Sequence, residues 1–497
     1  HKGGVDGGGT AGWMTAALSG RIAGKGLQIE LVESEQIGTV GVGEATIPQI
    51  RYLCDALKIP ETEFLAAVNG TYKLGIEFVN WGKIGDRYIH TFGDVGRRLG
   101  VLDFHQVWLR ARELGIESDL AKYSFGAIAA KENKFDHIEK LGDTGLLGLG
   151  YAFHFDASLV AKLLRKISEG NGVTRTEGKI DAVNLHAESG FIESLTLDNG
   201  ETVSGDLFID CSGFRSLLLG EALGVDYVDW SRWLPADSAI AVQCDAVEPL
   251  LPYTRATAHS AGWQWRIPLQ NRIGNGHVYS SPYMDDEQAR NILMSNLDGE
   301  PRTEPLQLRF TTGKREKFWY RNCIGLGLAS GFMEPLESTS IHLVQAGLGR
   351  LIDLFPTTDF TQSDIDEYNR RTDFEFESIR DFLILHYWAT ERDDSEFWNY
   401  CRTMEIPDSL QHKVDLWRAH GRFYRSEDEL FTTPSWIQVF VGQRVIPNDC
   451  HGMAKVLNKD DAEDYLRRIN GHLTEVVAKM PTHREFINRR CPMQETG

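Results

Sequence analysis

Residues 7–33 carry the pattern that most restricts the possible folds. Gly7, Gly9 and Gly12 form G-x-G-x-x-G, a helix can follow at 13–18, and an apolar stretch at 27–32 ends in Glu33, 21 residues after Gly12. In a dinucleotide-binding βαβ unit the glycines let backbone approach a pyrophosphate at a helix N-terminus, and the later carboxylate binds a ribose. We therefore predict an α/β fold whose cofactor contacts are Gly7, Gly9, Thr10, Ala11, Gly12 and Glu33.

The residues before this motif do not fit it. A Rossmann-like fold begins with an apolar strand, but residues 1–6 read His-Lys-Gly-Gly-Val-Asp. The sequence alone leaves open why the strand expected before Gly7 is not apolar. The same segment is too polar for the apolar part of a signal peptide.

Composition narrows the class of protein. A chain of 497 residues is expected to hold two or three structural units. Its formal charge of −19 and the absence of a long basic block argue against nucleic acid and anionic membranes as partners. The seven cysteines show no C-x-x-C pair, which indicates reduced thiols in a cytoplasmic protein and no metal site. No apolar run reaches the length of a transmembrane helix.

Several further segments are interpreted from their local pattern. We predict helices at 49–70, around 159–167 and beyond 350, and strands at 172–183, 191–197 and 206–210, with a hairpin turn at 198–200. The glycine-rich segment 39–48 is either a loop that lies against a ligand or an ordinary connection. Trp263 and Trp265 alternate along a strand, so they face the same side and either fill a core or stack on an aromatic ligand.

Two segments contain candidate catalytic groups. Lys73 interrupts the strand-like run 72–81; such a lysine usually extends to solvent, and the alternative is a buried amine that loses its proton more easily. Glycine-rich residues 324–333 precede Glu334, Glu337 and a helix start at 338–340. The acidic residues either complement the helix dipole or place an acid or base beside an anion site.

Six ordered motifs together resemble the flavin-dependent tryptophan halogenase family. They are GGGTAGW at 7–13, GVGEATIP at 41–48, YK at 72–73 with FVNW at 78–81, DCSGFR at 210–215, GWQWRIP at 262–268 and GFMEPLEST at 331–339. The resemblance implies a Rossmann-like, FAD-binding module of the flavin-monooxygenase type, interleaved with a substrate module and a mainly helical C-terminal part. It implies FAD-binding segments at 1–80 and 151–220, a substrate-side insertion at 81–150, substrate-module strands at 221–310, an FAD and halide segment at 311–350, and a helical substrate module at 351–497.

The resemblance also implies a chemistry. Reduced FAD, supplied by a separate flavin reductase, would react with dioxygen and halide to give hypohalous acid. Lys73 would hydrogen-bond this oxidant or become a haloamine, Glu337 would polarise the oxidant or take the proton from the arene, and Ser338 would support them. The implied contacts are Gly43, Glu44, Ala45, Gly327 and Leu328 for FAD, His90, Phe92, Trp263, Trp265 and Trp436 for the substrate, and Thr339 and Ser340 for the halide.

Two departures from the family refine these expectations. Many members have glycine at the position of Ser340, so bromide is a possible halide beside chloride. Residues 429–436 offer no equivalent of the segment that grips the amino-acid backbone of free tryptophan, which favours indole or a similar electron-rich arene. The alternatives are an FAD-dependent aromatic hydroxylase and a flavin-binding protein without catalysis. The sequence leaves open whether the protein is a monomer or a homodimer.

Overall fold

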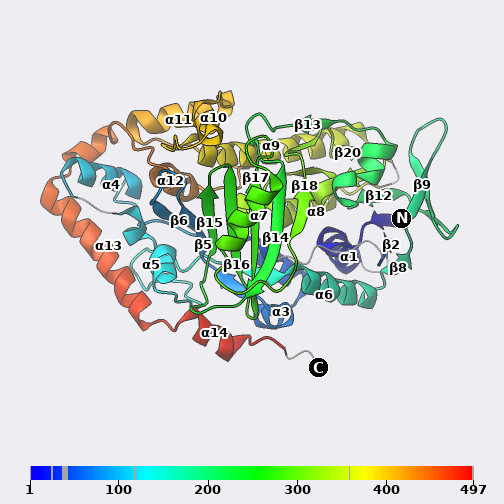
Figure 1. The fold of residues 1–497 in the computed structure, drawn as a ribbon, viewed down its shortest axis with the longest axis horizontal. Helices are drawn as coiled ribbons and strands as arrows, with labels where there is room; N and C mark the ends of the chain where they lie inside the picture. The colour runs from blue at the N-terminus through cyan, green and yellow to red at the C-terminus, as the bar shows by residue number, and fades with distance from the viewer. Residues whose placement is uncertain (1, 24–25, 36–42, 117–118, 358, 495–497) are drawn as a thin grey trace.

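The computed structural model describes residues 2–23, 26–35, 43–116, 119–357 and 359–494, and it shows a mixed α/β molecule (Figure 1). Within these residues the strands form two large sheets and three small ones. The dinucleotide motif lies at one end of the molecule and the C-terminal helices extend to the other. Part of predicted segment 39–48, namely 39–42, lies outside the described residues.

A six-stranded sheet forms the nucleotide-binding part. In spatial order it contains β20 (Trp319–Tyr320), β21 (Cys323–Gly325), β12 (Leu207–Asp210), β1 (Lys2–Asp6), β2 (Gln28–Glu33) and β8 (Thr174–Glu177). All neighbouring pairs are parallel except β20 with β21. The crossover helices α1 (Thr10–Ala23) and α6 (Ala157–Gly170) pack against each other beside this sheet. This is the doubly wound arrangement that the glycine motif predicts.

Residues 2–6, which lack the apolar character of a central strand, form β1 in the middle of the sheet. Backbone pairing to β2 and β12 holds the strand, and Val5 is its one large buried apolar side chain. At Gly4 a Cβ atom would lie 3.0 Å from the Phe208 ring, so the neighbouring strand supplies the apolar cover. The residues of one strand do not show that an apolar side chain of the neighbouring strand packs over it.

A seven-stranded sheet forms the central layer (Figure 1). Its strands are β18 (Leu306–Arg309), β14 (Ser238–Asp245), β17 (Arg272–Tyr279), β16 (Gly262–Pro268), β15 (Thr254–His259), β5 (Gly75–Val79) and β6 (Arg87–Thr91). The edge strand β6 is covered by α12 (Thr433–Gly442): the Gln438 amide donates to the Thr91 carbonyl, and its oxygen accepts from the Thr91 N–H. These two hydrogen bonds connect the C-terminal helix α12 to the strand that carries His90.

Three small sheets complete the β-structure. They are β3 (Gly43–Ala45), β7 (Ala152–Asp156) and β4 (Thr71–Lys73); β11 (Thr202–Ser204), β10 (Ile192–Leu197) and β9 (Ile180–Leu185); and β13 (Tyr227–Asp229), β19 (Gly313–Arg315) and β22 (Gly331–Phe332). In the first, β3 and β4 both pair with β7, which brings the end of β3 next to Lys73. The predicted turn at 198–200 is confirmed between β10 and β11.

The remaining helices are α2 (Ile50–Leu57), α3 (Glu61–Ala67), α4 (Phe104–Glu113), α5 (Phe125–Lys131), α7 (Asp286–Ser295), α8 (Ser340–Asp353), α9 (Gln362–Trp388), α10 (Glu396–Thr403), α11 (Asp408–His420), α13 (Lys459–Lys479) and α14 (His483–Arg490). The single helix predicted at 49–70 is two helices, because Lys58 is left-handed and Pro60 follows it. The helical character beyond residue 350 is confirmed.

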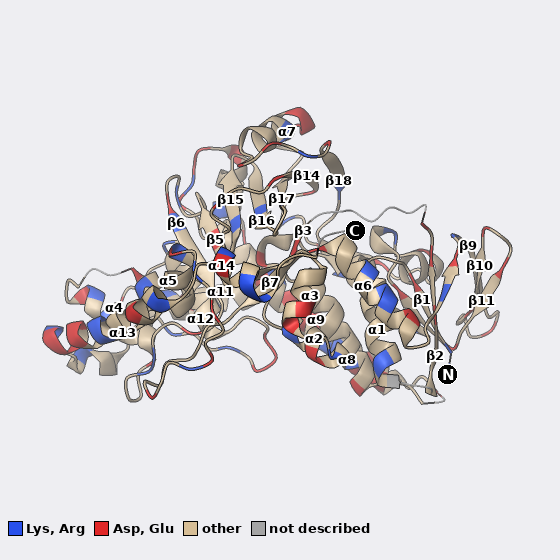
Figure 2. Ribbon diagram, turned by 90° about the horizontal axis from the view of Figure 1, so that it is seen from below, with Lys and Arg blue, Asp and Glu red and all other residues tan. Residues whose placement is uncertain are grey.

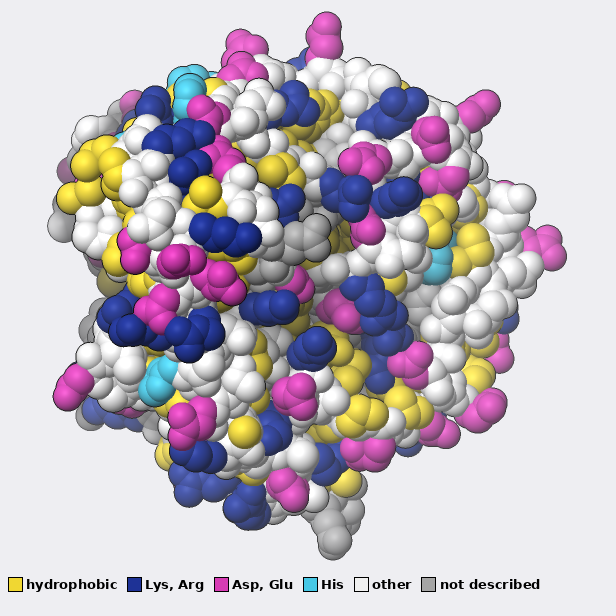
Figure 3. Space-filling view, turned by 90° about the vertical axis from the view of Figure 1, so that its left-hand side faces the viewer, with side chains coloured by type: hydrophobic (Ala, Val, Ile, Leu, Met, Phe, Trp, Pro, Cys, Tyr) yellow, Lys and Arg dark blue, Asp and Glu magenta, His cyan; other side chains and the backbone are white. Residues whose placement is uncertain are grey.

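Charges of both signs are distributed over the ribbon (Figure 2). On the face at the α4 and α13 end, basic and acidic side chains alternate without a region of one sign (Figure 3). None of the described helices is long and apolar enough to cross a membrane.

Candidate active site

A cavity of about 980 Å³ lies at the carboxyl ends of β1, β2 and β12, where a doubly wound sheet binds its ligand. All predicted cofactor residues except Gly12 line it: Gly7, Gly9, Thr10, Ala11, Glu33, Gly43, Glu44, Ala45, Gly327 and Leu328. Trp265, Ser338 and Ser340 line it as well.

The glycine turn fits a dinucleotide. A Cβ atom on Gly12 would lie 1.7 Å from the Gly7 carbonyl oxygen, so only glycine closes this turn, whereas Gly9 has open space around it. Glu33 lies across the turn, where its carboxylate accepts hydrogen bonds from Trp13 Nε1 (3.2 Å) and Arg175 Nε (2.6 Å). Gly327 adopts φ +64° and approaches Ala11 of α1, which brings the segment 327–328 to the same cavity. These residues fit FAD, whose pyrophosphate would be held at the start of α1.

Lys73 is fully buried, so it does not extend to solvent. Its Nζ donates to the Thr46 carbonyl (2.9 Å) and to the Ser338 hydroxyl (2.8 Å). Three separate motifs thus meet at this amine, and Ser338 also borders the cofactor cavity. The Phe92 ring lies 5.4 Å from the amine.

Burial lowers the pKa of Lys73 to about 7, and the nearby Glu337 carboxylate opposes this shift. Both protonation states are therefore present near neutral pH. A neutral amine uses its two N–H groups on Thr46 and Ser338 and keeps a free lone pair, whereas an ammonium keeps one free N–H donor. The site can act as a nucleophile in the first state and as a hydrogen-bond donor in the second.

Glu337 is a buried carboxylate held by two histidines. His90 Nδ1 lies 3.0 Å from both carboxylate oxygens, and His386 Nε2 lies 2.8 Å from Oε1. Burial alone would raise the pKa of Glu337, but the charges and hydrogen bonds of His90 and His386 outweigh it and hold the pKa at about 2. Glu337 is consequently ionised throughout the neutral range.

The hydrogen bonds of His386 fix its protonation. Its Nδ1 faces the Phe382 carbonyl at 2.7 Å, and its Nε2 faces the ionised Glu337. Both partners are acceptors, so both nitrogens must donate and the ring is an imidazolium. The second nitrogen of His90, Nε2, is buried and has no hydrogen-bond partner among the described residues, which leaves it for a bound molecule.

Glu334 lies three residues before Glu337, and its surroundings shift its pKa in the opposite direction. Its Oε1 accepts from Trp263 Nε1 (3.0 Å) and from the Tyr387 hydroxyl. Burial raises its pKa to about 7, against those two hydrogen bonds. The two carboxylates precede α8 and are buried, so they are not exposed residues of its first turn.

An aromatic wall borders His90. The Phe431 ring lies 6.4 Å from the His90 ring and stacks on Phe382 at 4.0 Å, and Phe382 in turn meets Trp436 edge-on at 4.8 Å. Phe431 and Phe382 thus both contact the His90 ring, whereas Trp436 stacks on Phe423.

Trp263 and Trp265 lie 6.2 Å apart on β16 but have different neighbours. Trp263 is buried against Trp81 and holds Glu334, whereas Trp265 lines the cofactor cavity. Their predicted roles in substrate binding stay predictions.

The predicted halide residues lie at the start of α8, as the sequence indicates. Thr339 precedes the helix and Ser340 begins it, and the Thr339 side chain makes no capping hydrogen bond. Ser338 has φ +58°, a left-handed conformation that turns the chain between the cofactor cavity and Lys73.

Comparison with known proteins identifies the family. The family model described as "Tryptophan halogenase" matches residues 4–459. The flavin-dependent halogenase Xcc4156 from Xanthomonas campestris is 47% identical, with a TM-score of 0.97, over 100% of this chain and 99% of its own. BrvH, a flavin-dependent halogenase from Brevundimonas sp. BAL3, is 42% identical over 99% of both chains with a TM-score of 0.95. The tryptophan 6-halogenase SttH of Streptomyces toxytricini is 36% identical over 84% of this chain and 83% of its own.

The chain belongs to the tryptophan halogenase family. It is an enzyme of the flavin-dependent halogenase class, for which FAD is the cofactor and a halide ion a co-substrate. The predicted recognition, fold class and enzyme class are confirmed.

Sequence reasoning missed several residues of this halogenase site. The backbone of Thr46 belongs to a recognised motif, but nothing in the sequence shows that its carbonyl holds Lys73. His386 was overlooked within the apolar helical run 382–387, where a single polar residue was the available signal. Phe431 was passed over in favour of Trp436.

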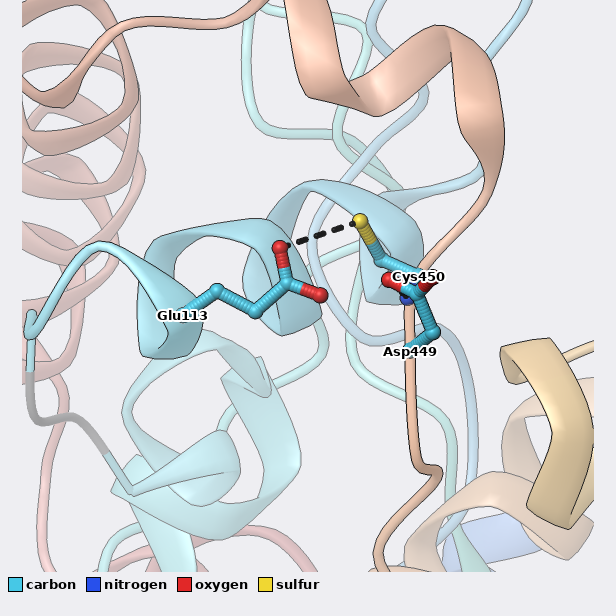
Figure 4. Close-up of side chains that lie close together, drawn as sticks. All are labelled: Glu113, Asp449 and Cys450. Carbon is cyan, nitrogen blue, oxygen red and sulfur yellow. Dashed lines mark hydrogen bonds between the residues drawn. The ribbon is translucent and has the colours of Figure 1, made fainter.

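One further cluster in the halogenase resembles a metal site, formed by Glu113, Asp449 and Cys450 (Figure 4). The Cys450 thiol donates to Glu113 Oε2 at 3.5 Å, and burial, followed by Glu113, raises its pKa. The Lys455 ammonium pairs with both carboxylates, at 2.8 Å from Glu113. The lysine already supplies the positive charge that a metal ion would bring.

Proposed function

We propose that this halogenase transfers an electrophilic halogen to an indole-like arene, with Lys73 and Glu337 as its catalytic residues. FAD, reduced by a separate flavin reductase, would supply the oxidising power that turns halide into hypohalous acid in the cofactor cavity. The observation that carries the proposal is the position of Ser338, which lines that cavity and accepts a hydrogen bond from the buried Lys73.

Lys73 would receive the oxidant. Its hydrogen bonds to Thr46 and Ser338 aim one remaining position of Nζ away from both partners. At pH values above about 7 that position is a lone pair that could attack the halogen of hypohalous acid, so that an N–halogen bond forms, the O–halogen bond breaks and the hydroxide leaves as water with an amine proton. Below about 7 it is an N–H that could polarise hypohalous acid. Full burial excludes water, which would otherwise compete with the arene.

Glu337 would take the proton that the ring releases after halogen addition. A pKa of about 2 makes Glu337 a weak base, but the protonated ring intermediate is a far stronger acid, so a permanently ionised carboxylate is sufficient. The arene would lie against His90, Phe92 and Phe431, with Trp263, Trp265 and Trp436 as outer parts of the aromatic enclosure. The N–H groups at Thr339 and Ser340 would hold the halide, with bromide accepted beside chloride.

The test is mass spectrometry of a reaction that contains the full chain, FAD, a flavin reductase, NADH and air. Indole and tryptophan compete in it, and bromide and chloride are both present. The expected product is halogenated indole with the halogen isotope pattern. Products that gain only oxygen would contradict halogenation and favour a hydroxylase, and preferred halogenation of tryptophan would refute the indole preference.

A further inference from the structure

Asp6 is a buried acid at an unexpected place. It ends β1 directly before Gly7, lines the cofactor cavity and is 7% exposed. Its Oδ2 is buried without a hydrogen-bond partner among the described residues. An ionised carboxylate in that position carries a large desolvation cost, whereas a protonated carboxyl group there is a donor that lacks an acceptor.

The hydrogen bonds around β12 determine which of two adjacent acids, Asp6 or Asp210, is ionised. Asp6 is in register with Asp210 of β12. Asp210 accepts hydrogen bonds from the backbone N–H groups of Ser212 (3.0 Å), Leu218 (2.9 Å) and Leu219 (2.8 Å), and from the Ser212 hydroxyl (2.5 Å). These donors stabilise a negative charge on Asp210, and two adjacent buried acids cannot both ionise at low cost. The proton therefore remains on Asp6.

The other groups around Asp6 do not reverse this assignment. Burial and then Asp210 raise the pKa of Asp6 well above its usual value, and Arg215 opposes them from an exposed position. The thiols of Cys211 and Cys323 are neutral because burial raises the pKa of each. On the β2 side Glu33 is paired with Arg175.

We propose that Asp6 is a neutral carboxylic acid that donates a hydrogen bond to the dinucleotide cofactor, so that FAD binding requires the Asp6 proton. The proposal needs only that the cavity binds FAD and is independent of the roles assigned to Lys73 and Glu337. The cofactor pyrophosphate is anionic, and an ionised Asp6 beside the first glycine of the turn would repel it.

A pH dependence of cofactor binding follows. Where the cofactor-free protein already holds the Asp6 proton, binding leaves the proton count unchanged and affinity is constant. At higher pH the proton must be taken up on binding, and affinity falls by up to tenfold per pH unit. Glu44 lines the same cavity, and burial raises its pKa to about 7, so its titration has to be separated from that of Asp6.

The experiment measures binding of oxidised FAD to the full chain by flavin fluorescence from about pH 6 to about pH 9. The wild type is compared with Asp6→Asn, and Glu44 is present in both proteins, so its titration contributes equally to the two curves. We expect the FAD affinity of the wild type to fall more steeply with pH than the FAD affinity of Asp6→Asn. Equal slopes in the two proteins, or weaker binding by Asp6→Asn at low pH, would overturn the proposal.

A second measurement does not depend on how the Asp6 variant folds. Calorimetric titration of the wild type with FAD, in buffers of different ionisation enthalpy, counts the protons taken up on binding. The proposal expects proton uptake that reaches at least one proton at the alkaline end. Proton uptake that stays at zero up to about pH 9 would exclude it.

Discussion

Replacing Glu337 by glutamine should destabilise this halogenase in a way that depends on pH. The carboxylate balances the His386 imidazolium and accepts from His90, and glutamine keeps the shape but removes the charge. The one side-chain oxygen of the glutamine can accept a hydrogen bond from His90 or from His386, and the amide N–H groups would face the other ring. The loss in folding stability is that of a broken buried ion pair.

The magnitude follows from the pKa of Glu337, which lies at about 2 against an ordinary 4.5. At about 1.4 kcal/mol per pH unit this difference stabilises the folded wild type by about 3 kcal/mol. Because the folded pKa is depressed, the contribution is fully present above about pH 4.5 and is lost as pH falls through about 2. More than half of it should be gone at about pH 3.

Glu334→Gln is the matched control, three positions away and equally buried. The glutamine oxygen can still accept from Trp263 and Tyr387. Burial raises the pKa of Glu334 to about 7, so the carboxyl contributes stability below 4.5 that is lost as pH rises through about 7. Relative to wild type, Glu334→Gln should therefore gain stability with rising pH, opposite to the loss at Glu337.

The assay is urea unfolding followed by tryptophan fluorescence between about pH 3 and about pH 8, with halogenation measured on the same preparations. Glu337→Gln should also slow halogenation about 100-fold, which is typical for loss of a positioned base. A Glu337→Gln protein within about 1 kcal/mol of wild type at neutral pH would refute the ion-pair reasoning. So would a stability difference that does not shrink in acid.

Three further predictions concern separate parts of the site. Lys73→Met should abolish halogenation while FAD binding and peroxide release continue; product detected by mass spectrometry would remove the amine from the mechanism. Ser340→Gly should raise the ratio of chlorinated to brominated product in a mixed-halide reaction, and an unchanged ratio would separate Ser340 from halide choice. Phe431→Ala should weaken indole binding about 10-fold in calorimetry because a stacking face is lost, with Trp436→Phe as the milder control, and equal affinities would place the arene elsewhere.

The cofactor site was predictable because its requirements are local. The turn closes only with glycine at position 12, so the residue types at neighbouring positions are enough to predict it. The environment of Lys73 is formed by segments near 46, 73 and 338. The family resemblance implied that Lys73 and Ser338 act together, but it did not indicate the contact with Thr46. His386 was not predictable, since a histidine within an apolar helix reads as one more buried position until the carboxylate opposite is placed. The apolar cover of β1 was not predictable, because it comes from Phe208 of the neighbouring strand.

The position of the Ser338 hydroxyl bears on which substitutions could alter the substrate of this enzyme. The hydroxyl belongs to the wall of the cofactor cavity and to the hydrogen bonds of Lys73, while His90, Phe431 and Glu337 lie outside that wall. In the proposed mechanism, Ser338 therefore links the cavity that generates the oxidant to the amine that receives it. Under that mechanism, substitutions at His90 or Phe431, which do not line the cofactor cavity, are expected to change which arene is accepted while FAD binding is retained.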